Sequence, residues 1–133
     1  MFKYVAVVGA GTMGSGIAQV IAQQKCDGYL YDVNDTVLRR AVERIKAELK
    51  QSVQKGKMTP EEMLAVVDRI RPKTHLPDLS PADFVIEAVV EDLRVKRDLL
   101  RRIEEVVKQG VVLATNTSSI PVTAIAAGSK QPS

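Results

Sequence analysis

The strongest constraint on the fold of this chain is a glycine-rich turn that follows a short apolar run. Residues 5–8 are all apolar, and Gly9, Gly11 and Gly14 follow them in the spacing G-x-G-x-x-G. A helix-like segment comes next, and a second apolar run ends at Asp32, 18 positions after Gly14. A strand, a glycine turn, a helix and a second strand that ends in an acid together predict a dinucleotide site. The glycine spacing alone would indicate only a turn.

Each residue of the turn has an expected task. Gly9 turns the chain out of the strand, Gly11 lets the main chain approach a pyrophosphate, and Gly14 lets the helix pack closely on the sheet. A side chain at any of these three positions would be an obstruction. The helix begins near Thr12, so the free amide groups of its first turn, which includes Met13, point at the phosphates. We therefore predict that these five residues bind the cofactor.

Asp32 predicts which dinucleotide is bound. Its carboxylate can accept hydrogen bonds from the adenosine ribose hydroxyls, and its negative charge would repel a 2′-phosphate. No basic residue follows it closely, because residues 33–36 are Val, Asn, Asp and Thr. The predicted cofactor is therefore NAD rather than NADP.

The length of 133 residues suits one domain, which we place at residues 1–133. This is short for a complete nicotinamide-dependent enzyme, so we expect a further domain to be absent from the chain. No apolar run approaches the roughly 20 residues that span a bilayer, and the first strand begins almost at once. We expect a cytoplasmic protein with no membrane partner. The single cysteine, Cys26, has no metal-ligand spacing around it and predicts a buried or half-buried structural thiol.

The net charge of +3 is too small to predict a nucleic-acid partner. The positive residues are concentrated between Asp35 and Lys57, where seven cations stand against three anions. The ordinary interpretation of this segment is a solvated helix face. The functional interpretation is a binding surface for an acidic ligand.

Short β-branched runs alternate with segments of helical period along the chain. Strands are predicted at residues 3–8, 28–32, 70–74, 84–89 and 111–114. Helices are predicted at residues 12–25, 38–56, 59–68, 92–110 and 120–128, with a capping box at 59–62 and a turn at 80–83. This alternation predicts an α/β fold of the Rossmann type. We expect a doubly wound parallel sheet of strand order 3-2-1-4-5, with a helical hairpin inserted after the second strand.

Ligands of such sheets bind beyond the carboxyl ends of the strands. Polar segments follow the first, fourth and fifth predicted strands, at residues 9–14, 87–92 and 116–119. We therefore expect these three segments to converge on one cleft.

The same three segments resemble one enzyme family closely. The run Gly9 to Gln19, the segment Glu87 to Asp92 and the turn Asn116 to Ile120 are similar to the N-terminal domain of 3-hydroxyacyl-CoA dehydrogenases, including bacterial 3-hydroxybutyryl-CoA dehydrogenases. The resemblance covers essentially the whole chain. It implies a part in fatty acid metabolism, in the reversible NAD-dependent oxidation of an L-3-hydroxyacyl-CoA to the 3-ketoacyl-CoA.

The resemblance also implies roles for single residues. Asp32 would hold the adenosine ribose, and Glu91 and Lys96 would lie near the nicotinamide end of NAD. Ser118 would hydrogen-bond the 3-oxygen of the substrate, and Asn116 would shape the turn around it. A serine hydroxyl suits an oxygen that changes between alcohol and carbonyl, but it is a poor proton acceptor.

The reaction also needs a general base with a pKa near neutrality. In the family this base is a histidine paired with a glutamate, beyond the last residue of this sequence. The only histidine here, His75, fits no family motif, and we expect it to be exposed and without a catalytic role. The helical domain that covers the acyl chain and forms the family's dimer is missing as well. We therefore expect the chain alone to bind NAD(H) without turnover, and the full-length form to be a homodimer.

The family places the phosphorylated adenosine end of CoA near the basic hairpin. Lys55 matches a lysine in that role, whereas Glu48 stands where the family has a serine. The predicted acyl-CoA contact therefore rests on Lys50, Lys55 and Lys57.

Alternatives to this interpretation stay open at the level of sequence. A freestanding NAD(H)-sensing module would need binding without catalysis, but it would not need a substrate-facing serine. Another NAD-dependent β-hydroxyacid dehydrogenase would explain the glycines but not the basic hairpin.

Glu87 and Glu91 have a simpler interpretation as solvated residues at a strand end. An apolar face and an open edge at the fifth strand also predict self-association of the isolated domain.

Overall fold

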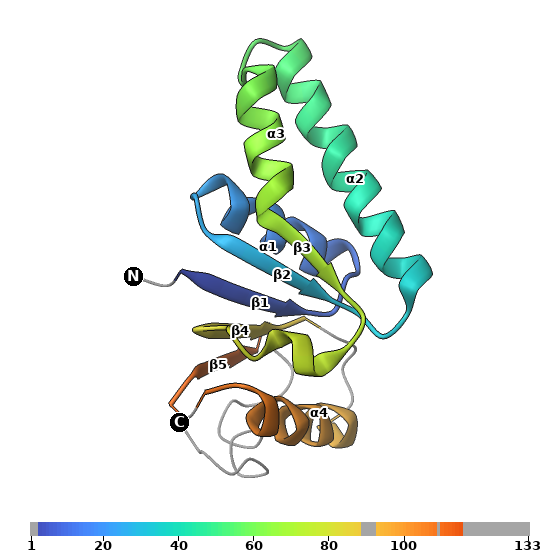
Figure 1. Cartoon of the computed structure of the whole chain (residues 1–133). Helices are drawn as coiled ribbons and strands as arrows, with labels where there is room; N and C mark the ends of the chain where they lie inside the picture. Colours follow the sequence, from blue (N-terminus) through green and yellow to red (C-terminus); the bar gives the residue numbers. More distant parts are fainter. Residues whose placement is uncertain (1–2, 89–92, 109, 116–133) are drawn as a thin grey trace.

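The protein is described by a computed structural model, which places residues 3–88, 93–108 and 110–115. Five parallel strands form one sheet in the order β3-β2-β1-β4-β5 (Figure 1). The elements in chain order are β1 (Tyr4–Val8), α1 (Thr12–Gln23), β2 (Asp27–Tyr31), α2 (Asp35–Gln54), α3 (Pro60–Arg69), β3 (Ile70–Lys73), the 3-10 helix η1 (Leu76–Leu79), β4 (Phe84–Glu87), α4 (Leu93–Val106) and β5 (Val112–Thr115). The predicted fold class and strand order are confirmed.

Apolar side chains cover both faces of the sheet, as a doubly wound fold requires. On one face, Val7 and Leu30 pack with buried residues of α1 and of the α2–α3 hairpin. On the other face, Ala6 and Val8 pack with η1 and α4. Successive residues of β1 therefore serve opposite layers. This explains why the strand has no polar position among residues 5–8.

The α2–α3 hairpin projects beyond the sheet (Figure 1). One stripe of α2 is buried, namely Leu38, Ala41, Ile45 and Leu49. The predicted capping box at the start of α3 is confirmed: the Glu62 amide donates to Oγ1 of Thr59 at 3.1 Å, and the Thr59 amide donates to Oε1 of Glu62 at 2.9 Å. The hydrogen bond from the Thr59 backbone amide holds the pKa of the Glu62 carboxyl below its usual value. The turn before α3 contains Gly56, whose φ of 72° favours glycine.

Several details differ from the sequence-based expectation, and three of these differences are described here. The first helix ends at Gln23 instead of residue 25, because Lys25 adopts a left-handed φ of 64° and Nη1 of Arg69 donates to the Ala22 carbonyl at 2.8 Å. The 3-10 helix η1 was not expected, and it buries Leu79 ahead of the predicted turn. The second helix begins earlier than predicted, because Oδ1 of Asn34 accepts the Val37 amide at 3.1 Å and caps it.

Several expected features lie outside the described residues. These are the beginning of the helix predicted at residues 92–110, the turn at residues 116–119 and the helix at residues 120–128. Within the part of the chain that is described, no helix is both long enough and apolar enough to cross a membrane.

Candidate functional site

The glycine turn joins β1 to α1 with very little space between them. Gly9 has a φ of 110°, a conformation that favours glycine, and its amide donates to the Tyr31 carbonyl at 2.8 Å. A Cβ atom added at Gly14 would lie 1.7 Å from the Gly9 carbonyl oxygen. The close helix–sheet contact expected at Gly14 is therefore present, and a side chain at that position would force α1 or the turn to move.

The second glycine of the motif, Gly11, has a different environment. A Cβ atom added at Gly11 would meet nothing within 4 Å, and its φ of −72° is open to any residue. Gly11 is the N-cap of α1 but supplies no side-chain acceptor, and the first turn of α1 contains no acidic residue. Thr12 and Met13 are exposed there. The protein itself therefore leaves the positive end of α1 open to an anionic group.

Asp32 lies directly after β2 and holds the glycine turn. The Ala10 amide donates to its Oδ2 at 3.0 Å, and the Asn34 amide donates to its Oδ1 at 2.9 Å. An ionised carboxylate has about four acceptor positions, so positions remain for a ligand hydroxyl. The carboxylate is half-buried and stays accessible from the carboxyl edge of the sheet.

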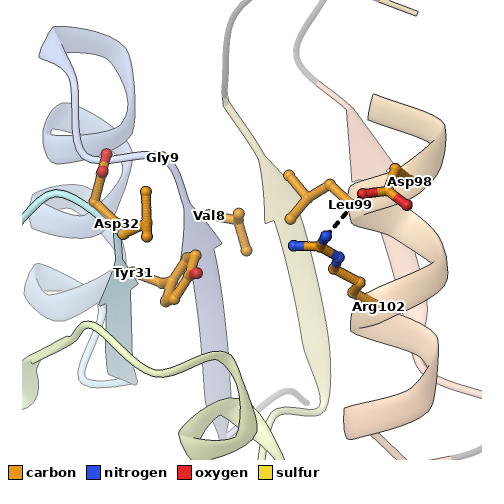
Figure 2. Close-up of a pocket in the computed structure, with 8 residues that line it drawn as sticks. Val8, Gly9, Tyr31, Asp32, Asp98, Leu99 and Arg102 are labelled. Atoms are coloured by element: carbon orange, nitrogen blue, oxygen red, sulfur yellow. Dashed lines mark ion pairs between the residues drawn. The ribbon is translucent and has the colours of Figure 1, made fainter. Parts of the chain in front are cut away.

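A pocket of about 270 Å³ opens beside Asp32 (Figure 2). Its floor is formed by the ends of β1 and β2, and its wall by α4, with lining residues Val8, Gly9, Tyr31, Asp32, Val33, Asp98, Leu99 and Arg102. In the wall, Nη2 of Arg102 pairs with Oδ2 of Asp98 at 3.2 Å. Sequence reasoning missed this wall. The only signal was the spacing of Asp98 and Arg102, which is also typical of an ordinary exposed helical ion pair.

These features together fit the adenosine diphosphate half of a dinucleotide. The open N-terminus of α1 suits a diphosphate, Asp32 suits ribose hydroxyls, and the largely apolar pocket beside it suits a planar base. The fit rests on backbone positions and one carboxylate.

Comparison with known proteins identifies the family. Residues 4–133 match the family described as "3-hydroxyacyl-CoA dehydrogenase, NAD binding domain". The chain belongs to this family. Its cofactor is NAD, as the sequence predicted.

Relatives of known name are similar over nearly the whole chain. The 3-hydroxyadipyl-CoA dehydrogenase of Escherichia coli K12 is 45% identical over 128 residues, which are 96% of this chain and 27% of that protein. A probable 3-hydroxybutyryl-CoA dehydrogenase of Bacillus subtilis is 38% identical, over 98% of this chain and 45% of that protein. The crystal structure of a 3-hydroxybutyryl-CoA dehydrogenase from Escherichia coli K12 superposes with a TM-score of 0.96 at 44% identity, over 99% of this chain and 28% of that one.

The chain thus spans less than half the length of these relatives. What it shares with them is the NAD-binding domain of an oxidoreductase family of fatty acid metabolism.

The structure brings only part of the predicted site together. The glycine turn and Asp32 meet at the carboxyl ends of β1 and β2. Lys96 belongs to α4, but its side chain is not among those described. Glu91, Asn116 and Ser118 lie outside the described residues, so their assignments remain predictions.

The predicted CoA-binding lysines lie near and just beyond the C-terminal end of α2, whereas the glycine turn lies near the N-terminal end of that helix. Lys50, Lys55 and Lys57 are all exposed, at the end of α2 and in the turn that follows it. With 20 residues, α2 is about 30 Å long, and it begins close to Asp32. Within the described part of the chain, none of these three lysines forms an ion pair.

Three further expectations can be compared with the structure. Glu87 is fully buried at the end of β4, so its interpretation as a solvated residue is wrong. The parallel register places it beside Val8, the residue before the glycine turn. His75 is exposed and Cys26 is half-buried, as predicted.

Proposed function

We propose that this chain is the NAD-binding part of an enzyme that reversibly oxidises an L-3-hydroxyacyl-CoA to the 3-ketoacyl-CoA. The observation that carries the proposal is the match to the family over residues 4–133, on a chain whose glycine turn and Asp32 fit a dinucleotide. Two relatives are named as dehydrogenases of 3-hydroxyadipyl-CoA and of 3-hydroxybutyryl-CoA, and these names support a 3-hydroxyacyl-CoA as the substrate.

The roles of this chain's residues follow from the chemistry of the reaction. NAD, when bound, would supply the acceptor for a hydride from the carbinol carbon. The turn Gly9 to Gly14 and Asp32 hold the adenosine half, and Glu91 and Lys96 are assigned to the nicotinamide end. Ser118, oriented by Asn116, donates a hydrogen bond to the 3-oxygen of the substrate, whose charge increases as the ketone is reduced.

Among the described residues, no histidine lies beside the glycine turn to accept the proton of the substrate hydroxyl. His75 is exposed and follows β3, the edge strand, which is separated from β1 by β2. A base from the remaining part of the full-length protein is therefore required. The chain alone is expected to bind NADH and to leave a 3-ketoacyl-CoA unchanged.

The lysines of the hairpin supply the second binding surface of the proposed enzyme. Lys50, Lys55 and Lys57 have no acidic partner within the described part of the chain, and their charges suit the phosphates of CoA. A CoA held there would direct its acyl end to the substrate domain. The full-length form is proposed to be a homodimer through that domain.

Domain exchange tests this function directly. One protein is the 133-residue chain, and the other is a chimera in which it replaces the matching N-terminal segment of the Bacillus subtilis relative. Oxidation of NADH by acetoacetyl-CoA is followed at 340 nm. We expect turnover by the chimera, no turnover by the chain, and NADH binding by both.

The controls separate folding from chemistry. Ser118→Ala in the chimera should lower kcat by about 100-fold while NADH binding is retained. A chimera that folds and binds NADH but turns over neither acetoacetyl-CoA nor longer 3-ketoacyl-CoAs would contradict the proposal. Turnover by the 133-residue chain alone would contradict the assignment of the base.

A further inference from the structure

Arg44 connects the hairpin to the nucleotide end of the domain. It lies at the middle of α2, and its Nη1 donates to Oγ of Ser15 at 2.9 Å. Ser15 is 2% exposed in the first turns of α1, and its hydroxyl donates to the Thr12 carbonyl at 3.1 Å. A guanidinium from α2 is thereby held against the beginning of α1.

Arg44 is exposed to solvent, and its guanidinium has no hydrogen-bonded acid within the described part of the chain. It forms no ion pair there, although Glu48 lies one helical turn away on α2. Both residues line a small cavity of about 50 Å³ between α1 and α2, together with Thr12 and Ser15. Arg44 has five donor groups, and the contact to Ser15 accounts for one.

In the free protein this arrangement places two positive groups near the beginning of α1, and Glu48 is the acid that lines the same cavity. The N-terminus of α1 carries the positive end of a helix dipole, and its first turn has no acidic residue and no capping side chain. A cation beside it adds charge of the same sign. A bound diphosphate would neutralise both the helix N-terminus and the Arg44 guanidinium, so an anion of that kind would be bound favourably between them.

We propose that Arg44 is a second anchor for a nucleotide diphosphate at the N-terminus of α1. The diphosphate that we expect to bind is that of the dinucleotide. CoA also contains an adenosine diphosphate group and could supply it instead. The inference needs only the family's NAD site, and it does not depend on the acyl-CoA activity proposed above.

Calorimetric titration of the 133-residue chain tests the proposal. NADH, ADP-ribose and CoA are each titrated into the wild type and into Arg44→Gln, Arg44→Lys and Ser15→Ala, at 25 mM and at 300 mM salt. We expect Arg44→Gln to bind NADH and ADP-ribose about fivefold more weakly at low salt, and the difference to shrink at high salt. Arg44→Lys should lose less affinity for these two ligands than Arg44→Gln, because lysine keeps the positive charge.

Ser15→Ala is the matched control, because it removes the hydrogen bond and keeps the guanidinium. Its affinity for NADH should stay within about twofold of the wild type. A loss confined to CoA would assign Arg44 to the diphosphate of CoA instead of that of NAD. Unchanged affinity of Arg44→Gln for all three ligands would overturn the proposal. An equal, salt-independent loss in Arg44→Gln and Ser15→Ala would also overturn it, since Arg44 would then act only as a helix contact.

Discussion

The carboxyl edge of the sheet and the tip of the hairpin prepare for anionic ligands in opposite ways. At the sheet edge, the backbone makes the site: Gly9 and Gly14 are in contact, and Asp32 is held by two backbone amides. At the tip, Lys50 and Lys55 are exposed side chains on a capped helical hairpin. At the sheet edge, the addition of a single methyl group to a glycine should therefore lower ligand affinity strongly. Binding at the tip should change gradually with charge.

Gly14→Ala should have the largest effect at the sheet edge. The new Cβ would lie 1.7 Å from the Gly9 carbonyl oxygen, so α1 or the turn must move. We expect a loss of about 3 kcal/mol in the free energy of unfolding. NADH affinity should fall about 100-fold, which is about 2.7 kcal/mol. Urea unfolding and NADH titration measure the two effects.

Gly16→Ala is the matched control on the same helix. A Cβ at this position meets nothing within 4 Å, so alanine should raise the free energy of unfolding by about 0.5–1 kcal/mol and leave NADH binding unchanged. If the two variants behaved alike, the close contact at Gly14 would not determine the site.

Gly11→Ala should separate ligand binding from stability. The free protein has open space at this position and an ordinary φ, so the free energy of unfolding should change by less than about 0.5 kcal/mol. The added methyl group faces the place assigned to the diphosphate, and NADH affinity should fall about tenfold. Retained NADH affinity in a stable variant would show that the ligand does not approach this position.

Lys55→Glu should affect only the hairpin. We expect the apparent KM of the chimera for acyl-CoA to rise about fivefold at low salt, with the KM for NADH unchanged. Lys46→Glu is the control, because it makes the same charge change on α2. In the wild type Nζ of Lys46 lies 3.9 Å from Oε1 of Glu43, and the effect of this variant on the KM for acyl-CoA should be smaller. Equal KM values for acyl-CoA in the wild type and Lys55→Glu would remove the hairpin from the substrate site.

Asp83→Asn should have the smallest effect and should act at the opposite edge of the sheet. Oδ2 of Asp83 accepts the amides of Tyr4 at 2.9 Å and Lys3 at 3.1 Å. The Tyr4 amide, followed by the Lys3 amide, holds the pKa of this carboxyl below its usual value. The ionised form therefore stabilises the fold at neutral pH, and this contribution disappears as pH falls through the lowered pKa.

The expected result is a lower Tm for Asp83→Asn at pH 7, with the difference from the wild type closing below about pH 4. NADH binding at pH 7 should be unchanged, in contrast to changes at Asp32. Asp78→Asn, at an exposed position in η1, is the control. A Tm difference that does not depend on pH would contradict the role of the charge.

Much of this fold was predictable because its signals are local. Strand order and the capping box at Thr59 follow from apolar periodicity, glycine positions and helix-cap chemistry. The early start of α2 was missed because Asn34 was not recognised as a cap. The helix η1 was missed because a four-residue 3-10 turn has no periodicity to detect.

The candidate site was predictable where the backbone forms it and not where the tertiary structure does. Gly9, Gly14 and Asp32 are linked by sequence spacing, and the structure joins them as expected. The pocket wall on α4 and the contact of Arg44 with Ser15 connect residues distant in sequence. A charged exposed helix face looks the same in sequence with or without such contacts. For the same reason, the burial of Glu87 could not be inferred.

The central claim is that a side-chain-free turn and the Asp32 carboxylate select unphosphorylated NAD. Calorimetric titration of the 133-residue chain with NADH and with NADPH tests this most directly. We expect one NADH to bind per chain, and NADPH to bind at least about tenfold more weakly because its 2′-phosphate would be repelled by the Asp32 carboxylate. Absence of NADH binding, or tighter binding of NADPH, would contradict it.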